Sequence, residues 1–586
     1  MAAPDARPDS EDPPVLTRRG RAVVAGVALT ALGTAVASPG HALEPDASVE
    51  TVTSATPAGP GSPAGAGTAE PAATPLPGLA EVPSDPRPNV VVVMADDMRD
   101  DEVRWMPNLQ RLLGEGGVRF ENSFSPHPIC CPARASFVSG QYTHNHGVWS
   151  NGRNFGFGAY DDRQSLATEL SEVGYNTAFL GKYLNGYGAE PPHDGSAEDS
   201  LTYVPPGWTD WRGAVGSPPG WDSEEAGGTY RYRDTTLNVN GTLRGNQGWY
   251  QTEMLGTETE DVIGQFARSP RPFFLWASYV APHIGLPDEA DDPTTLRRSD
   301  GVESRIKTPA RPPRVWGLFD DLITEAPGAA GEADVSDKPY FIRSLPEATA
   351  EEREAMATLT RQRAESLYVL DEQIGRTADA LEAAGELDDT IFMFTSDNGF
   401  FIGEHRMRSG KLLPYEPSLR VPTLMSGPGI PAGQTRRDPF LTIDFAPTIL
   451  DAAGARPDPA MDGVSQLEVA RTGDRGWTRG VLTESGPLNA HKYPRGPGPL
   501  LDVRPGGPSP LRFSQGVRTD RYLYVEYASR EQELYDLRRD PGQLENLADE
   551  PATAPVVREL ARELDRLRMC RSDGCATPLP ADLQAR

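Results

Sequence analysis

The stretch NVVVVMADD at residues 89–97 decides the fold of this 586-residue chain. Its unbroken apolar run has no polar alternation, which is typical of a strand covered on both faces, as in parallel sheets. Folded structure is therefore expected to begin here. Asp96 and Asp97 follow the run at once. They could cap a following helix, or they could serve a site, because ligand groups in open α/β sheets gather at the carboxyl ends of strands.

Helical patterns alternate with apolar runs in the rest of the first 400 residues. Apolar residues recur every three or four positions over 166–173 and 367–381, which predicts amphipathic helices. Apolar runs over 177–180, 273–280 and 391–395 predict strands. This alternation indicates an α/β fold with a mostly parallel central sheet flanked by helices.

The pattern changes at about residue 475. Polar and aromatic residues alternate in SQGVRTDRYLYVEY at 514–527, which predicts antiparallel strands with one face in water. A helix is expected at 554–568. We therefore predict a large α/β domain over 87–474, followed by a smaller C-terminal α+β subdomain with an antiparallel sheet over 475–586. The stretch 185–250, rich in turns and aromatic residues, is expected to be an insertion that forms a rim.

The N-terminal segment has the features of an export signal over 1–42. Arg18, Arg19 and Arg21 precede an apolar run of about fifteen residues and then small residues. The arginine pair favours a twin-arginine signal; a Sec signal or a membrane-anchoring segment is the alternative.

Between this signal and the first strand, residues 43–86 are rich in Ala, Pro, Gly, Ser and Thr. Such a segment cannot bury enough apolar surface to offset its ordering entropy, so a disordered linker is expected. No later segment reaches eighteen apolar residues, so no stable membrane span is expected in the mature chain. The mature protein is expected to be secreted or extracytoplasmic.

Net charge and cysteine content limit the partners that the protein could bind and the disulfides that it could form. The chain has 56 Lys plus Arg against 84 Asp plus Glu, a net charge of -28, which repels nucleic acid and anionic membranes. Of its four cysteines, Cys570 and Cys575 could close a small disulfide loop in an oxidising compartment. Cys130 and Cys131 would then lack partners, because adjacent cysteines almost never bond to each other.

Polar side chains follow every expected strand of the central sheet. Each has an ordinary explanation alone, such as a turn at residues 396–399 or a solvated lysine. Together, carboxylates that converge at strand ends need a counter-charge, and oxygen ligands favour a hard cation, Ca²⁺ or Mg²⁺, over zinc. These side chains are Asp96, Asp97, Lys182, His283, Asp397 and Asn398.

Residues 130–140, CCPARASFVSG, resemble the sulfatase signature, Cys-x-Pro-(Ser/Ala)-Arg followed by a hydroxyl residue and glycine. The likeness extends over about 88–550. Together with GQYTHNHGV (140–148), GKYLNGYG (181–188) and VPPGWTDW (204–211), it is most similar to the N-acetylglucosamine-6-sulfatase branch. The resemblance implies an alkaline phosphatase-like fold and hydrolysis of a sulfate monoester, on a sulfated sugar such as N-acetylglucosamine 6-sulfate.

The resemblance also implies a modified residue. In this family a formylglycine-generating enzyme oxidises the first cysteine of the signature to Cα-formylglycine (3-oxoalanine), which is Cys130 in this sequence; Cys131 is the variable position. A thiolate that attacked sulfate would leave an S-sulfonate with no easy exit. An aldehyde hydrate has two hydroxyls: one attacks sulfur as the alcohol departs, and the second then releases sulfate and restores the aldehyde.

Further roles follow from positions that match the family's motifs. The implied metal ligands are Asp96, Asp97, Cys130, Asp397 and Asn398, for Ca²⁺ or Mg²⁺. The implied catalytic residues are Cys130, Arg134 to hold the hydrate, Lys182 and Lys411 to neutralise the sulfate, His283 to protonate the leaving oxygen, and His405 near the sulfate.

Two positions depart from the family pattern. Many sulfatases have a histidine two residues after the lysine of the GK motif, where this chain has Leu184 and then Asn185. Relatives often have a histidine where this chain has Phe401. Both positions are expected near the leaving group, so they bear on the substrate more than on the reaction. The loops at 185–250 and 485–510 are expected to set specificity.

Three alternatives remain at this point. A phosphonate monoester or phosphodiester hydrolase of the same superfamily could use the same modified cysteine. A non-catalytic carbohydrate-binding protein would keep the fold with an unmodified Cys130. The HNH triplet at 144–146 could indicate a nuclease or zinc site, although a structural role is favoured because no cysteine partners or basic surface lie nearby.

Overall fold

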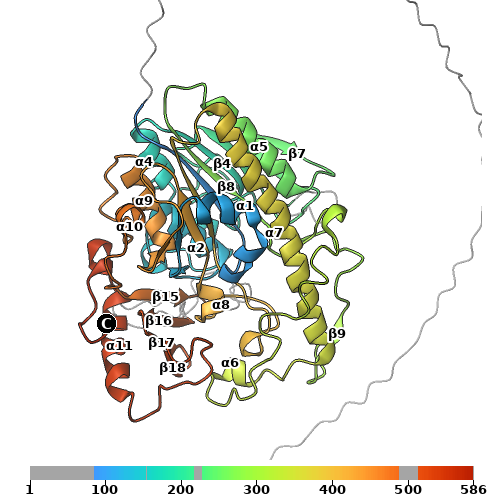
Figure 1. Cartoon of the computed structure of the whole chain (residues 1–586), viewed down its shortest axis with the longest axis vertical. Coiled ribbons are helices and arrows are strands. Elements are labelled where there is room, and N and C mark those ends of the chain that lie inside the picture. Colours follow the sequence, from blue (N-terminus) through green and yellow to red (C-terminus); the bar gives the residue numbers. More distant parts are fainter. Residues whose placement is uncertain (1–84, 153–154, 217–227, 487–512, 585–586) are drawn as a thin grey trace, which may run out of the picture. The chain divides into compact units, whose positions relative to one another are not determined.

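The central sheet is mixed and mostly parallel, as predicted. The computed structural model describes residues 85–152, 155–216, 228–486 and 513–584 (Figure 1). Within these residues the largest sheet has ten strands in the order β13-β2-β12-β11-β1-β8-β4-β5-β6-β7. Its five inner neighbours are parallel: β11 (Thr390–Ser396), β1 (Asn89–Ala95), β8 (Phe273–Ser278), β4 (Asn176–Lys182) and β5 (Asp210–Ala214).

Shorter strands complete both sides of this sheet. On the β11 side these are β12 (Thr423–Ser426), β2 (Val118–Phe120) and β13 (Gln434–Arg436), and on the β5 side β6 (Thr236–Val239) and β7 (Thr242–Gly245). The two-stranded pairs elsewhere are β3 (Ser123–Phe124) with β14 (Phe440–Leu441) and β9 (Leu296–Arg297) with β10 (Glu303–Ser304).

The stretch 185–250 differs from the predicted rim insertion, because it supplies β5, β6 and β7 of the central sheet. Strand β5, with sequence DWRGA, is short and carries charged residues, so it lacks the apolar run that marks the inner strands. Trp211 on this strand is nevertheless fully buried. The prediction missed these strands because the pairing of β5 with β4 is a long-range property that local pattern does not encode. Other parts of the stretch, at 185–187 and 228–231, line a cavity beside Lys182, in agreement with a rim.

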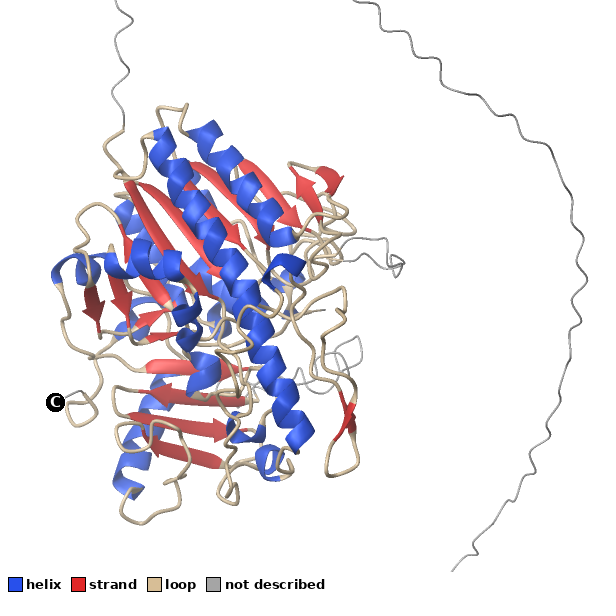
Figure 2. Ribbon diagram, turned by 45° about the vertical axis from the view of Figure 1, so that its right-hand side comes forward, coloured by secondary structure: helices blue, strands red, loops and turns tan. Residues whose placement is uncertain are grey.

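Helices cover both faces of the central sheet. Alternate residues of β1 are apolar on each face, and both faces are buried under helices. One face packs on α2 (Cys130–Ser139), α4 (Leu166–Glu172), α9 (Phe445–Ala452) and α10 (Leu467–Thr472). The other packs on α1 (Pro107–Leu109), α5 (Gln251–Phe266) and α7 (Ala350–Ala384), and Figure 2 shows α5 and α7 side by side over the strands. The remaining helices are α3 (Thr143–His146), α6 (Tyr340–Arg343), α8 (Glu416–Leu419) and α11 (Ala554–Leu567).

Helix α7 begins well before the predicted residue 367. Its first turn is closed by a capping box: the amide of Glu352 donates to the Thr349 hydroxyl at 3.1 Å, and the Glu352 carboxylate accepts from the Thr349 amide at 2.9 Å. The first half of the helix buries polar side chains such as Arg363, which pairs with Glu102. These buried charges interrupt the apolar periodicity from which the helix was predicted.

The C-terminal sheet is antiparallel, as predicted, and contains β15 (Val481–Ser485), β16 (Ser514–Arg518), β17 (Tyr522–Tyr527) and β18 (Gln532–Asp536). The predicted water-facing side is wrong. Helix α11 covers one face through Leu560, Leu564 and Leu567, and the other face packs against Phe401 and Tyr415 of the loop that follows β11. This contact connects the C-terminal sheet to the loop that follows β11 of the central sheet.

A buried carboxylate, that of Glu533, joins the C-terminal sheet to Tyr415 of the loop that follows β11. Glu533 on β18 accepts hydrogen bonds from the hydroxyls of Tyr415 at 2.8 Å, Tyr527 at 2.6 Å and Tyr535 at 2.7 Å. Tyr535→Phe removes one of these donors and is expected to lower the free energy of unfolding by about 1.5–3 kcal/mol, the usual range for a hydrogen bond to a charged group. Chemical denaturation measures this change, with Tyr340→Phe as control because Tyr340 is 70% exposed. An equal effect of both substitutions would contradict the prediction.

The cysteines pair as predicted. Cys570 and Cys575 form a disulfide, whereas Cys130 and Cys131 are free and buried. The export signal at 1–42, the linker at 43–86 apart from its last two residues, and most of the loop at 485–510 lie outside the described residues. None of the described helices has the length and apolar character needed to cross a membrane.

Candidate active site

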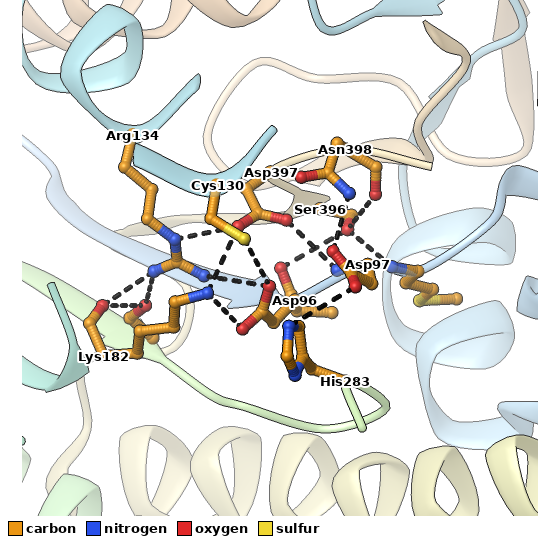
Figure 3. A network of polar contacts seen from close by, with 12 residues as sticks. Asp96, Asp97, Cys130, Arg134, Lys182, His283, Ser396, Asp397 and Asn398 are labelled. Atoms are coloured by element: carbon orange, nitrogen blue, oxygen red, sulfur yellow. Dashed lines mark hydrogen bonds and ion pairs between the residues drawn. The ribbon is translucent and has the colours of Figure 1, made fainter. Parts of the chain in front are cut away.

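The ends of four parallel strands bring the predicted polar side chains to one edge of the sheet. Ala95 of β1 is level with Ser396 of β11, and Met94 and Gly181 are both level with Ser278 of β8. The residues that follow these positions therefore emerge together (Figure 3). The side chains at this edge are Asp96, Asp97, Lys182, His283, Asp397 and Asn398, as the sequence predicted.

Asp96 lies at the centre of the cluster and is fully buried. One carboxylate oxygen, Oδ1, lies 3.5 Å from Cys130 Sγ and 4.0 Å from Arg134 Nη2, and the other pairs with the Lys182 ammonium. Burial alone would raise the pKa of Asp96, but the positive charge of Lys182 and its cationic neighbours outweighs burial and lowers this pKa. The carboxylate is therefore ionised.

Asp97 has a left-handed backbone, with φ of 67°, which a residue other than glycine rarely adopts. Its amide donates to Asp397 Oδ1 at 3.1 Å, which holds the turn in place. Its Oδ1 accepts from Asn398 Nδ2 at 2.7 Å and pairs with the Lys411 ammonium. Backbone strain of this kind persists where surrounding contacts enforce it, often at functional sites.

Cys130 is the first residue of α2, whose ten residues are all buried. Its Sγ lies 2.8 Å from Lys411 Nζ, at the positive end of the helix dipole. Burial raises the pKa of the Cys130 thiol to about 12, and the Asp96 carboxylate adds to this effect. An unmodified thiol at this position would thus remain protonated at neutral pH and be a poor nucleophile.

Arg134 lies one helical turn after Cys130 and points into the same cluster (Figure 3). Its Nε donates to Asp397 Oδ2 at 2.8 Å, and its Nη1 donates to the Lys182 carbonyl at 2.7 Å and to the Ser278 hydroxyl at 2.5 Å. The guanidinium thereby connects the helix to three of the strands. Arg134 is positioned to fix the side chain at position 130 relative to the strand ends.

Lys182 and Lys411 supply the positive charge of the site. Burial opposes their protonation, but the carboxylates of Asp96 and Asp97 dominate and raise the pKa of both ammonium groups. Both lysines therefore remain charged in a buried site, which suits the neutralisation of an anionic group.

His283 follows the cis peptide between Ala281 and Pro282 on the loop after β8. Its Nδ1 lies 2.6 Å from the Ile284 carbonyl, an acceptor, so Nδ1 carries a proton. Its Nε2 lies 3.6 Å from Asp97 Oδ2. Burial lowers the pKa of His283, although Asp96 and Asp97 partly oppose this. The reactive nitrogen facing the cluster is therefore Nε2.

His405 has different neighbours. Its Nδ1 lies 2.8 Å from Glu332 Oε2, and its ring stacks on Tyr415 at 4.1 Å. Among the described residues these contacts connect His405 to the C-terminal sheet contact rather than to the carboxylate cluster. Its predicted role near the sulfate stays a prediction.

The chemistry of the cluster fits a divalent cation. Ligand atoms of Asp96, Asp97, Cys130 and His283 all lie within 4.8 Å of one another. Asn398 Oδ1 is buried and has no hydrogen-bond partner among the described residues, which leaves an oxygen acceptor aimed at no protein donor. Carboxylate and amide oxygens are the ligands that Ca²⁺ and Mg²⁺ prefer. Asp397 lies beside this group, with its oxygens held by Asp97 and Arg134.

The HNH triplet has a structural explanation. His144 contacts the Glu484 carboxylate at 3.0 Å through Nδ1 and the Cys570 carbonyl at 2.9 Å through Nε2. His146 contacts the Ser136 hydroxyl at 3.0 Å and the Val148 amide at 3.1 Å. Both ring nitrogens of each histidine are therefore occupied by protein groups, which supports the structural interpretation over a zinc or nuclease site.

Two neighbours of the cluster were missed in the sequence. Ser278 is a polar residue at the end of the apolar strand FFLWAS, and that change in polarity was an available signal. Tyr230 stacks on His283 with ring centroids 4.4 Å apart. It lies within the stretch interpreted as a rim, and no local pattern connects it to a histidine 53 positions later.

Comparison with known proteins agrees with this geometry. Residues 88–455 match the family described as Sulfatase, and residues 508–570 match the one described as N-sulphoglucosamine sulphohydrolase, C-terminal. The chain is similar to N-acetylglucosamine-6-sulfatase of Homo sapiens, with 30% identity over 84% of this chain and 86% of that protein. It is also similar to arylsulfatase of Volvox carteri, with 30% identity over 84% of this chain and 76% of that protein.

Solved structures share the fold. One is a protein in complex with its substrate D-glucosamine-2-N,6-O-disulfate (TM-score 0.60, 22% identity, 82% of this chain and 97% of that chain). Another is phosphonate monoester hydrolase of Agrobacterium radiobacter (TM-score 0.58, 23% identity, 85% and 99%). Fold and site together define a hydrolase of the alkaline phosphatase superfamily. Within that superfamily, the chain belongs to the sulfatase family.

Proposed function

We propose that this protein hydrolyses a sulfate monoester on a sugar such as N-acetylglucosamine 6-sulfate. The observation that carries the proposal is the position of Cys130, the first residue of the Cys-x-Pro-Ala-Arg motif, with its Sγ 2.8 Å from Lys411 Nζ and 3.5 Å from Asp96 Oδ1. A residue converted here to formylglycine would supply, as its hydrate, an oxygen nucleophile and a second hydroxyl for release of sulfate. A dedicated formylglycine-generating enzyme is the required maturation partner.

The chain's own side chains provide the other functions. Lys182 and Lys411 would offset the negative charge of the sulfate, and Arg134 would hold position 130 relative to Asp397. His283, in its imidazolium form with a second proton on the Nε2 that faces the cluster, would donate that proton to the oxygen of the departing alcohol. Asp96, Asp97, Asp397 and Asn398 would hold Ca²⁺ or Mg²⁺, which supplies a lowered pKa at the nucleophile and polarisation of sulfate oxygens.

A cavity beside Lys182 supports a sugar as the leaving group. It has a volume of about 310 Å³, near the lower end of the range for small-molecule pockets. Its lining includes Lys182, Asn185, Thr229, Tyr230 and Arg231. Hydroxyl, amide and cationic groups of this kind suit the hydroxyls of a sugar. Similarity to N-acetylglucosamine-6-sulfatases at 30% identity supports glucosamine 6-sulfate in particular.

The decisive experiment pairs a peptide mass of residues 128–140 with turnover of matched esters. We expect the mass of an aldehyde in place of the Cys130 thiol, and faster hydrolysis of N-acetylglucosamine 6-sulfate than of galactose 6-sulfate or choline sulfate. Faster hydrolysis of an aryl phosphonate monoester than of the aryl sulfate would assign the alternative activity of the superfamily. An unmodified Cys130 with binding but no hydrolysis would assign a carbohydrate-binding protein.

We further propose that the mature chain is secreted or extracytoplasmic, by a twin-arginine or Sec signal. The Arg18-Arg19 pair before an apolar run supports export, and the Cys570–Cys575 disulfide supports an oxidising compartment. Fractionation of the producing cell with N-terminal sequencing tests this. Full-length protein retained with the cytoplasm would refute it.

A further inference from the structure

Tyr230 lies among three groups of the site without belonging to the family signature. Its ring stacks on the His283 imidazole, with centroids 4.4 Å apart and an interplanar angle of 27°. Lys182 Nζ lies 5.0 Å from the centroid of the same ring. Asn185 Nδ2 donates a 2.7 Å hydrogen bond to the Tyr230 hydroxyl. One aromatic ring is therefore in contact with the proposed proton donor and one of the sulfate-neutralising lysines.

The backbone holds Tyr230 to the loop that carries His283. The Leu286 amide donates to the Tyr230 carbonyl at 2.9 Å, and the Tyr232 amide donates to the Leu286 carbonyl at 2.8 Å. The Tyr232 hydroxyl donates to the carbonyl of His283 itself at 2.8 Å. These bonds join the segment 230–232 to the segment 283–286, so the two aromatic rings are fixed to one framework.

Contacts at the two nitrogens of the imidazole do not by themselves fix its plane, because the ring can still tilt about the line that joins them. Nδ1 is bonded to the Ile284 carbonyl and Nε2 lies 3.6 Å from Asp97 Oδ2, and Tyr230 covers one face of the ring. Removal of that face contact would allow the ring to rotate and would change the direction of Nε2. Catalytic groups lose rate when they depart from the productive geometry by more than about 0.5 Å or 10–20°.

We propose that Tyr230 is a positioning residue, whose ring holds the His283 imidazole so that Nε2 faces the ester oxygen of the departing alcohol. This inference rests on the proposed function. Tyr230 and Asn185 also line the cavity of about 310 Å³ beside Lys182, and the buried Asn185 Oδ1 has no hydrogen-bond partner among the described residues. The alcohol is thus expected to lie in this cavity, between Lys182 and the stacked rings.

Leaving-group dependence tests the proposal. A sugar alcohol is a poor leaving group that needs a proton, whereas a nitrophenolate leaves without one. Tyr230→Met, in which an unbranched side chain replaces the ring, is expected to lower kcat on the sugar sulfate by about 10²-fold, the lower range of general acid effects, and kcat on nitrophenyl sulfate far less. Tyr230→Phe keeps the ring and should retain most of kcat on both substrates; loss of the hydroxyl, which lines the cavity, is expected to appear in KM for the sugar sulfate instead.

A double-mutant cycle separates positioning from a general structural effect. If Tyr230 acts through His283, Tyr230→Met should cost little further activity on the sugar sulfate in a His283→Ala background. Tyr340→Leu, at a tyrosine that is 70% exposed, is the control for loss of a tyrosine. Thermal unfolding of each variant checks that the fold is intact, and Tyr230→Leu replaces the methionine variant if that one does not fold.

Three results would overturn the inference: equal losses on both leaving groups, a Tyr230→Phe variant as impaired as Tyr230→Met, or additive losses in the cycle. Failure of the proposed function is a different result, namely a wild-type protein that cleaves no sulfate ester. If the wild type cleaves phosphonate monoesters, the same variants are compared on phosphonates with alkyl and nitrophenyl leaving groups.

Discussion

Cys130→Ala is expected to abolish hydrolysis while the fold remains intact. Loss of the nucleophile in an enzyme that uses covalent catalysis costs on the order of 10⁴-fold or more in kcat, because the remaining groups still bind and polarise the substrate but have nothing to transfer the sulfonyl group to. Alanine fits the buried start of α2 without a new polar group. Turnover of a sulfate ester, with circular dichroism and thermal unfolding of the same preparations, measures the effect.

The neighbouring residue provides a matched control. Cys131 is also buried and free, and its Sγ contacts the Asn185 carbonyl at 3.6 Å rather than the cluster. Cys131→Ala removes the same atoms one position away, so it should keep hydrolysis and lose at most about 1–2 kcal/mol of stability, as is usual for one small buried truncation. A Cys130→Ala enzyme with wild-type turnover would refute the covalent role. Loss of turnover in Cys131→Ala but not in Cys130→Ala would show that the nucleophile derives from Cys131 and not from Cys130.

Those parts of the fold that depend on local apolar pattern were predictable. The four valines at 90–93 indicated a strand covered on both faces, and β1 packs against helices on both sides. The rule that polar ligands gather at the carboxyl ends of parallel strands then predicted that Asp96, Lys182 and Asp397 lie close together. This worked because strand ends in a parallel sheet are level in register, whatever the length of the connections between them.

Contacts that depend on distant pairing were not predictable. The apolar periodicity of α7 is interrupted by Arg363, a buried charge whose partner Glu102 lies 261 positions away, although the capping box at Thr349 was a local signal for the start of the helix. The second face of the C-terminal sheet is covered by Tyr415 from another part of the chain. The stacking of Tyr230 on His283 needs the pairing of two loops. In each case the unpredicted contact depends on long-range burial, which no window of neighbouring residues contains.

Asp97→Asn is expected to have the second large effect, through loss of metal binding. Asparagine is one of the few residues that accept a left-handed backbone, so it should tolerate the φ of 67° at this position and remove only the charge. Metal affinity should fall at least ten- to hundredfold, about the effect of disturbing a ligand's surroundings, and hydrolysis should fall with it. In the wild type, Ca²⁺ at about 100 times its Kd should stabilise the fold by about 2.7 kcal/mol.

Thermal unfolding of chelator-treated protein, titrated with Ca²⁺ and separately with Mg²⁺, measures metal binding without reference to activity. The control is Asp291→Asn, because Asp291 belongs to a second group of close carboxylates with Glu289 and Asp292, but pairs with Arg311 at 2.5 Å and is partly exposed. If the cluster at the strand ends holds the ion, Asp97→Asn should remove the metal-dependent rise in unfolding temperature and Asp291→Asn should leave it unchanged. If only Asp291→Asn removed the metal-dependent rise, the metal site would be assigned to the group that contains Glu289, Asp291 and Asp292. A third outcome is a wild type whose unfolding temperature changes with neither cation and which still hydrolyses the sulfate ester after chelation. That result would mean that Lys182, Lys411 and Arg134 suffice to balance the negative charge of the sulfate during the reaction.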